Sequence, residues 1–302
     1  MMRRVVITGL GICTGVGCGA TNFWFGLRSG KSGVGPVTIF DASALPVRIG
    51  SQVMDLDPRQ LASRFPQAAG ERDRKLWLGL DAAVQAIVDG GLEARALAEA
   101  LLVVGVSLET FFLSDVTALA QVDNPASALR EITHGHVGPR LQTPLDELAN
   151  VLGDHYGFKG GRYTNCSACA AGSQAIGEAF QRIRDGTAEL ALAGASDSVL
   201  NPLAMGGFSL LQILSTENND PTKACRPFDA TRAGTVLGEG SAFLLMEAAE
   251  HAQRRGARMY AEVLGYGSSL DAYRVTDPEP NGKGATLSMI KALRDCTTLA
   301  VC

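Results

Sequence analysis

The sequence predicts a layered α/β protein in which a parallel-rich sheet carries helices on both faces. Short apolar segments with strand character alternate with segments of helical periodicity along most of the chain. Of the 302 residues, 35 are glycine, well above the roughly 7% of average proteins, which favours tight turns and close backbone approaches. With 46% hydrophobic residues the chain can bury a large core, so we expect a folded protein.

The elements follow from the spacing of apolar residues. The β-branched residues Val5, Val6 and Ile7 predict a strand over residues 5–8, which runs into a glycine-rich loop and a helix near residues 22–28. Residues 74–89 predict a helix, because apolar residues recur at helical spacing and Gly90 and Gly91 end it. Further strands are expected at 101–106, 189–193, 242–246 and 259–265, a helix at 248–255, and a mixture of loop and helix over 121–150.

Two segments of the chain resemble each other. Residues 3–11 and 258–267 each run from a basic residue through a strand into a Gly-x-Gly turn. This repeat predicts a duplicated fold with a first domain over residues 1–256. The second copy would start within residues 257–302 and would be only begun there.

Composition excludes several classes of protein. A net charge of −4 gives no general attraction for polyanions, so we expect no nucleic-acid partner. The N-terminal segment mimics a signal peptide, but its repeated glycines make a poor helical core, and no segment has the roughly 18 apolar residues that span a bilayer. The seven cysteines predict reduced thiols in a cytoplasmic protein; they are Cys13, Cys18, Cys166, Cys169, Cys225, Cys296 and Cys302.

Two familiar motifs are incomplete. Gly9-x-Gly11 after a strand suggests a dinucleotide site, but Thr14 occupies the place of the third glycine and the acidic ribose ligand is missing, so a structural turn is favoured. None of the histidines has metal-ligand spacing with the thiols, and we expect all four to be solvated or bonded locally. They are His134, His136, His155 and His251.

The stretch TNCSACAAGSQAIG, residues 164–177, is the strongest candidate site. Its two thiols, Cys166 and Cys169, allow four interpretations: half of a zinc site completed by Cys13 and Cys18, a thioredoxin-like dithiol, a pair of buried core cysteines, or one catalytic nucleophile. The local sequence alone leaves these alternatives open.

The nucleophile interpretation depends on position. Residues 163–168 are expected to be extended and residues 170–184 helical, which places Cys169 in the first turn of the helix. Unpaired N–H groups and the positive end of the helix dipole stabilise a thiolate there. Small neighbours such as Ala168 and Gly172 leave room for an acyl substrate, and a free N–H can receive an oxyanion, as in a nucleophile elbow.

Several ordered blocks then identify a family resemblance. The blocks are RRVVITGLGICTGVG, NCSACAAGSQAIGEAFQRIRDGTAELALAGASDS, MGGFSLLQILSTENND and NGKGATLSMIKALRD. With them the sequence resembles an elongating β-ketoacyl-acyl carrier protein synthase, a condensing enzyme with the thiolase-like fold. The resemblance implies an α-β-α-β-α architecture whose N-terminal half is complete and whose C-terminal half is only begun. It ends near Asp295, and we expect a C-terminally truncated member.

The resemblance also implies a reaction. Cys169 matches the family nucleophile, which takes an acyl group from the phosphopantetheine of a carrier protein. Malonyl-carrier protein is then decarboxylated, and its enolate attacks the thioester. The chain itself would bind no cofactor and no metal. The two histidines and the lysine that assist the family's condensation belong to motifs that this sequence lacks, so catalytic competence without a companion chain is in question.

The resemblance assigns the remaining residues. Arg72, Arg74 and Lys75 match basic residues that dock the acidic carrier protein, and Phe208 matches a position that lines the acyl pocket. A homodimer or heterodimer is expected. Two alternatives remain: a non-catalytic homologue that binds a carrier protein or a complete synthase, and a CxxC dithiol oxidoreductase.

Overall fold

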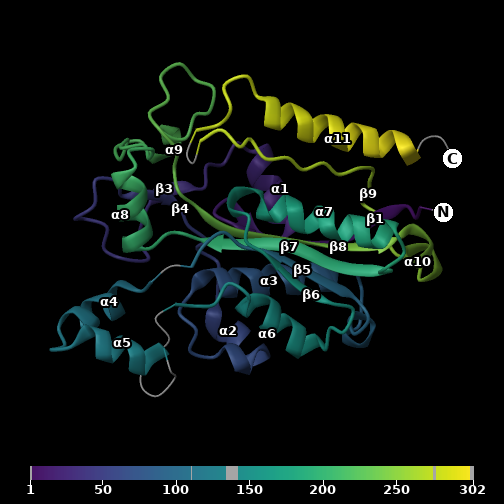
Figure 1. Cartoon of the computed structure of the whole chain (residues 1–302), viewed down its shortest axis with the longest axis horizontal. Helices are drawn as coiled ribbons and strands as arrows, with labels where there is room; N and C mark the ends of the chain where they lie inside the picture. Colours follow the sequence, from purple (N-terminus) through teal and green to yellow (C-terminus); the bar gives the residue numbers. More distant parts are fainter. Residues whose placement is uncertain (1, 110, 134–141, 275–276, 300–302) are drawn as a thin grey trace.

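A central sheet organises the computed structural model, which describes residues 2–109, 111–133, 142–274 and 277–299 (Figure 1). The strand order is β2-β1-β8-β7-β5-β6, and β9 also pairs with β1. The strands are β1 (Val5–Thr14), β2 (Gly17–Cys18), β5 (Leu101–Gly105), β6 (Arg162–Asn165), β7 (Leu190–Ser198), β8 (Glu239–Ala248) and β9 (Ala261–Val263). A separate ribbon pairs β3 (Val34–Pro36) with β4 (Ile49–Ser51).

The sheet is mixed rather than parallel-rich. Strand β5 runs parallel to β6 and β7, but β8 runs antiparallel to both β7 and β1. Strand β8 is antiparallel to β7 because the connecting residues 199–238 leave and return at the same edge of the sheet. The last residue of β7, Ser198, therefore pairs with the first residue of β8, Glu239. A helical crossover would have made these strands parallel.

Helices cover both faces of the sheet, as predicted (Figure 1). One face packs on α3 (Arg74–Asp89) and α6 (Glu147–Tyr156), and the other on α7 (Ala171–Arg184). Alternate residues of β5 belong to the apolar cores on the two faces of the sheet: Leu102 and Val104 face α3, whereas Leu101 and Val103 face α7. The described residues form one large sheet, and the second sheet of the expected five-layer arrangement is not built within them.

An outer helix lies over α7. Helix α11 (Lys283–Leu299) joins it through an ion pair of 2.5 Å between Arg184 and Asp295. The remaining helices are α1 (Ala20–Arg28), α2 (Pro58–Arg64), α4 (Leu113–Ala120), α5 (Pro125–Thr133), α8 (Pro202–Leu210), α9 (Pro221–Ala224) and α10 (Ala249–Arg254). Within the described residues no helix combines the length and apolar character that a membrane crossing requires.

The glycines after the first predicted strand do not form a loop. Strand β1 continues to Thr14, with Gly9 and Gly11 inside it. A Cβ on Gly9 would lie 2.2 Å from the carbonyl oxygen of Ala86, and one on Gly11 would lie 1.8 Å from that of Ala82. These glycines therefore let α3 lie directly on β1, which agrees with a structural role and not with a dinucleotide site.

A buried ion cluster fixes β8 to α10 and to the segment that follows it. The Glu247 carboxylate has no solvent exposure and accepts hydrogen bonds from Thr8 and Arg255, and its Oε2 lies 2.5 Å from Nδ1 of His251. Burial by itself would raise the pKa of Glu247, but the bonds from Arg255, Thr8 and His251 outweigh it and hold the pKa below its ordinary 4.5.

Candidate active site

Cys169 lies in the turn that connects a parallel strand to a helix. Strand β6 ends at Asn165, a 3₁₀ turn covers Ala168–Ala170, and α7 begins at Ala171. Cys169 is exposed in that turn, two residues before the helix rather than inside its first turn as predicted. The carboxyl edge of the parallel strands is where ligands bind in open α/β sheets.

Close packing sets the height of the turn above the sheet. A Cβ on Gly105, the last residue of β5, would lie 2.6 Å from the carbonyl carbon of Ala171, so only glycine allows α7 to start there. Ala168 has φ of 53°, a left-handed conformation that costs a non-glycine residue roughly 1–2 kcal/mol. This sharp turn presents Cys169 outward, as a nucleophile elbow does.

Three polar side chains anchor the turn, and the sequence analysis did not single them out. Oδ1 of Asn165 accepts hydrogen bonds from the backbone N–H of Ser167 at 2.9 Å and from its hydroxyl at 2.5 Å. Nδ2 of Asn165 donates to Oε1 of Gln174 at 3.1 Å. An asparagine two residues before a serine at a strand end is the pattern of an Asx turn, and that pattern could have revealed them.

The structure separates the four interpretations of the thiol pair. Cys166 and Cys169 are both exposed, so the buried-core interpretation is wrong. Among the described residues, the group of potential metal ligands that comes together is Cys13, Cys18 and Asp81, without Cys166 or Cys169. The four-cysteine zinc site is therefore wrong as well. The nucleophile and dithiol interpretations both place an exposed thiol at this turn.

Of the described histidines, His155 is exposed and His251 is bonded locally, as predicted. His155 packs against Phe65 with ring centroids 4.4 Å apart, and burial, followed by the charge of Arg64, lowers the pKa of His155. His251 pairs with Glu247. His134 and His136 lie outside the described residues.

The basic residues predicted to dock a carrier protein face different surroundings. Nη1 of Arg72 donates to Oδ1 of Asp115 at 2.9 Å, and its guanidinium lies 3.9 Å from the centre of the Phe112 ring. The Arg72 side chain is 38% exposed and is the most accessible of the three.

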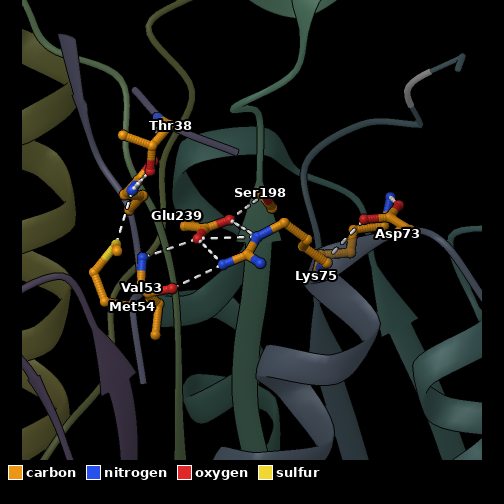
Figure 2. Close-up of polar contacts among 9 residues, drawn as sticks. Thr38, Val53, Met54, Asp73, Lys75, Ser198 and Glu239 are labelled. Carbon is orange, nitrogen blue, oxygen red and sulfur yellow. Dashed lines mark hydrogen bonds and ion pairs between the residues drawn. The ribbon is translucent and has the colours of Figure 1, made fainter. Parts of the chain in front are cut away.

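Arg74 and Lys75 each pair with a buried carboxylate of the protein. Figure 2 labels Lys75 and Asp73 of one pair, and Glu239 with its neighbours Ser198 and Val53. Nε of Arg74 donates to Oε2 of the fully buried Glu239 at 2.8 Å, and Glu239 also accepts bonds from the Ser198 hydroxyl and the Val53 N–H. Lys75 is 4% exposed. Its ammonium lies 3.1 Å from Oδ2 of Asp73 and donates to the carbonyl of Leu108 at 3.0 Å. Arg72, Arg74 and Lys75 are close in sequence but do not form one exposed patch.

Phe208 lies on α8 and lines an apolar groove of about 400 Å³. Its neighbours there include Leu108, Phe111, Leu203 and Leu211. Leu108 follows β5, whose last residue, Gly105, supports the start of α7. The groove and the Cys169 turn therefore both adjoin the carboxyl end of β5.

Comparison with known proteins identifies the family of this chain. Residues 2–252 match the family described as "Beta-ketoacyl synthase, N-terminal domain". The chain is 37% identical over 298 residues to 3-oxoacyl-[acyl-carrier-protein] synthase 2 of Synechocystis sp., covering 97% of this chain and 69% of that protein. It is 34% identical over 302 residues to a putative polyketide beta-ketoacyl synthase 1 of Streptomyces cyaneus, with 97% and 68% covered.

Solved structures agree with the sequence comparison. The ishigamide ketosynthase/chain length factor superposes with a TM-score of 0.79 at 30% identity, covering 98% of this chain and 70% of that one. A beta-ketoacyl synthase from Burkholderia phymatum STM815 superposes with a TM-score of 0.78 at 29% identity, with 98% and 71% covered. The sequence match, the mixed α/β sheet and the strand-turn-helix that carries Cys169 lead to one conclusion: the chain belongs to the β-ketoacyl synthase family.

Proposed function

We propose that this protein takes up an acyl group on Cys169 from the phosphopantetheine thioester of an acyl carrier protein, as a step of fatty-acid or polyketide chain elongation. The observation that carries the proposal is the exposed Cys169 thiol on a strained turn between a parallel strand and α7. A small, uncrowded turn lets a thioester carbonyl approach the sulfur.

The chemistry is an exchange of thioesters. The Cys169 sulfur attacks the carbonyl carbon, and the tetrahedral oxyanion forms beside the N-terminal end of the 14-residue helix α7, whose dipole favours negative charge. The bond from that carbon to the phosphopantetheine sulfur then breaks. The carrier leaves as a thiol after protonation, and the acyl group remains on Cys169.

Condensation needs donors for the enolate oxygen, and the described histidines do not supply them. His155 lies on α6, on the opposite face of the sheet from α7. His251 binds Glu247, which pairs with Leu190 at the amino end of β7, away from the carboxyl edge. Removing one such donor costs about 3 kcal/mol, two to three decades in rate. We therefore assign acyl transfer to the described residues and expect condensation to draw on other groups, such as those of a companion chain.

The proposed partners are an acyl carrier protein and a second synthase-type chain, in a cytoplasmic homodimer or heterodimer. Two similar structures support this choice: the ishigamide ketosynthase/chain length factor, and one described as "AntDE:AntF (apo): type II PKS acyl-carrier protein in complex with its ketosynthase bound to the hexaketide". The carrier is acidic by the resemblance, and Arg72 is the most exposed cation of the predicted docking set.

Intact-mass analysis after incubation with octanoyl-loaded carrier protein tests the proposal. The wild-type chain and Cys166→Ala should each gain one octanoyl group, whereas Cys169→Ala should gain none. Cys166 is the matched control because it is an exposed thiol three residues away. An adduct that survives Cys169→Ala, or no adduct on a chain that still binds the carrier, would contradict the proposal, and the latter result would favour the non-catalytic alternative.

A second pair of measurements separates the remaining alternatives. Carbon dioxide release from malonyl-carrier protein measures the decarboxylation that condensation requires, and we expect very little from this chain alone. A dithiol oxidoreductase would instead reduce a disulfide substrate in a reaction that Cys166→Ser abolishes. Such an activity, together with a Cys166–Cys169 disulfide in the oxidised protein, would replace acyl transfer as the assigned function.

A further inference from the structure

A second pair of cysteines faces each other across the hairpin at the end of β1. Cys13 on β1 and Cys18 on β2 are directly opposed in register, next to the pair of Thr14 and Gly17 that closes the turn. The carbonyl of Ile12 accepts a hydrogen bond from the N–H of Gly19 at 2.8 Å, so the neighbouring pair, Cys13 and Cys18, is a non-hydrogen-bonded one.

This register suits a disulfide. Directly opposed residues at non-hydrogen-bonded positions have Cα atoms about 4.5 Å apart, inside the range of about 4.4–6.8 Å that disulfides span. The two sulfur atoms and a carboxylate oxygen of Asp81 all lie within 4.8 Å of one another. Both thiols therefore point to the same face of the hairpin, toward α3.

The pair is separate from the acyl-transfer site. The strand order β2-β1-β8-β7-β5-β6 puts four strand spacings between β1 and β6, which Cys169 follows. At about 4.8 Å for each spacing, the two thiol sites are on the order of 19 Å apart. The function proposed for Cys169 uses neither Cys13 nor Cys18.

We propose that Cys13 and Cys18 form a reversible intramolecular disulfide when the protein meets a peroxide, making the β1–β2 hairpin a redox-sensitive site.

The two thiols are unequal, which sets the order of the steps. Cys18 is half-buried, whereas Cys13 has no exposure and packs among Val53 and Leu78. The hydrogen bond from the Cys13 thiol lowers the pKa of Cys18, while the same bond, burial and the charge of Asp81 raise the pKa of Cys13. Cys18 is thus the more accessible and more acidic thiol, and Cys13 is the adjacent thiol that resolves it, the arrangement of redox-sensing pairs.

The chemistry balances with hydrogen peroxide as the oxidant. The Cys18 thiolate attacks one peroxide oxygen and the O–O bond breaks, which gives Cys18 sulfenic acid and a hydroxide that is protonated to water. The Cys13 sulfur then attacks the Cys18 sulfur, the S–O bond breaks, and the departing hydroxide takes the Cys13 proton to form a second water. Two thiols and one hydrogen peroxide become one disulfide and two waters. A dithiol reductant reverses the change by thiol–disulfide exchange.

A metal site is the competing use of the same groups, and the structure favours the disulfide. Structural zinc takes four protein ligands, but the cluster found among the described residues has three: Cys13, Cys18 and Asp81. An open zinc site with three protein ligands needs solvent or substrate beside the ion, whereas Cys13 is enclosed by apolar side chains. A disulfide requires only the two sulfur atoms that the hairpin already aligns.

Peptide mass analysis tests the proposal on the full chain. After hydrogen peroxide treatment, blocking of free thiols in denaturant and trypsin digestion, Cys13 and Cys18 fall in one peptide, residues 5–28, and Cys166 and Cys169 in another, residues 163–182. We expect peptide 5–28 to lose two hydrogens and to escape alkylation, and dithiothreitol to restore two alkylatable thiols. If Cys13 and Cys18 both stay alkylatable under peroxide that oxidises the exposed thiols of peptide 163–182, the proposal is wrong.

Two variants keep the test independent of folding at the buried position. Cys18→Ser changes the more exposed partner and should leave Cys13 alkylatable after peroxide. Asp81→Asn removes the negative charge beside both thiols and should speed disulfide formation at least about threefold. Slower oxidation in Asp81→Asn, or a stoichiometric zinc ion in the purified protein that Asp81→Asn releases, would overturn the disulfide in favour of a metal site.

Discussion

Replacing Arg74 with alanine should weaken the fold, although its sequence position suggests a surface docking residue. Arg74 is the cationic partner of Glu239, whose side chain has no exposure, and Nη2 of Arg74 also donates to the Val53 carbonyl at 2.9 Å. Without the guanidinium, Glu239 keeps its bonds from Ser198 and from the Val53 N–H but loses its counter-charge. Breaking a buried ion pair on one side costs about 3–5 kcal/mol, and since the Arg74 side chain is 26% exposed we expect the lower value, about 3 kcal/mol.

Arg72→Ala is the matched control. The Arg72 side chain is 38% exposed and pairs with Asp115 near solvent, so its loss should cost at most about 1 kcal/mol. At roughly 2 °C for each kcal/mol in a chain of this size, the melting temperature should fall by about 6 °C for Arg74→Ala and by at most about 2 °C for Arg72→Ala.

Carrier binding then separates structure from docking. In titrations of folded protein below both melting temperatures, Arg72→Ala should weaken binding of the acidic carrier, with the larger effect at low salt, and Arg74→Ala should bind like wild type. If Arg74→Ala melts like wild type and loses the carrier instead, then the buried ion pair has been misjudged and Arg74 belongs to the docking surface.

Three further predictions address packing, acid stability and the groove. Gly11→Ala should unfold the protein or lower its melting temperature by more than 10 °C, because the added Cβ meets the Ala82 carbonyl oxygen at 1.8 Å and the strain is on the order of several kcal/mol. Gly35→Ala is the control, since a Cβ there has nothing within 4 Å and should change the melting temperature little. Glu247 has a depressed pKa in the folded state, so the stability it contributes is present above pH 4.5 and is lost as the pH falls through the lower folded value. In urea titrations from pH 6 to pH 3, the free energy of unfolding should therefore fall less steeply with pH in Glu247→Gln than in the wild type, and an equal slope would contradict this. If Phe208 bounds the acyl groove, Phe208→Ala should shift the rate of Cys169 acylation toward longer acyl chains by roughly tenfold, and an unaltered chain-length profile would assign Phe208 to packing alone.

Local patterns in the sequence predicted the elements that depend on local physics. The helix at residues 74–89 was found with its observed bounds because apolar residues repeat along its length and two glycines follow it. The continuously apolar segment from Leu101 predicted a buried strand with parallel neighbours, and β5 is one. These signals lie within the segment itself, so no distant residue was needed to interpret them.

Strand direction and charge burial depend on distant residues. The apolar residues of β8 look the same in either direction, and its antiparallel pairing follows from the path of residues 199–238. Lys75 looks like a solvated residue at a helix start. Its burial depends on Asp73 and on the carbonyl of Leu108, 33 residues further along the chain. The sequence pattern around Lys75 does not predict its contact with the Leu108 carbonyl.

The candidate site combines both kinds of information, and this explains why it was predicted only in part. The strand-turn-helix pattern around Cys169 is local, so the nucleophile could be chosen from the order of small and apolar residues. The height of the turn depends on Gly105, which is 64 positions earlier by residue number and touches the backbone of Ala171. Because any Cβ at Gly105 would push the start of α7 off the sheet, the glycine that ends β5 positions the thiol as effectively as the residues beside it. A search for the determinants of this nucleophile should therefore include the ends of the neighbouring strands as well as the cysteine motif.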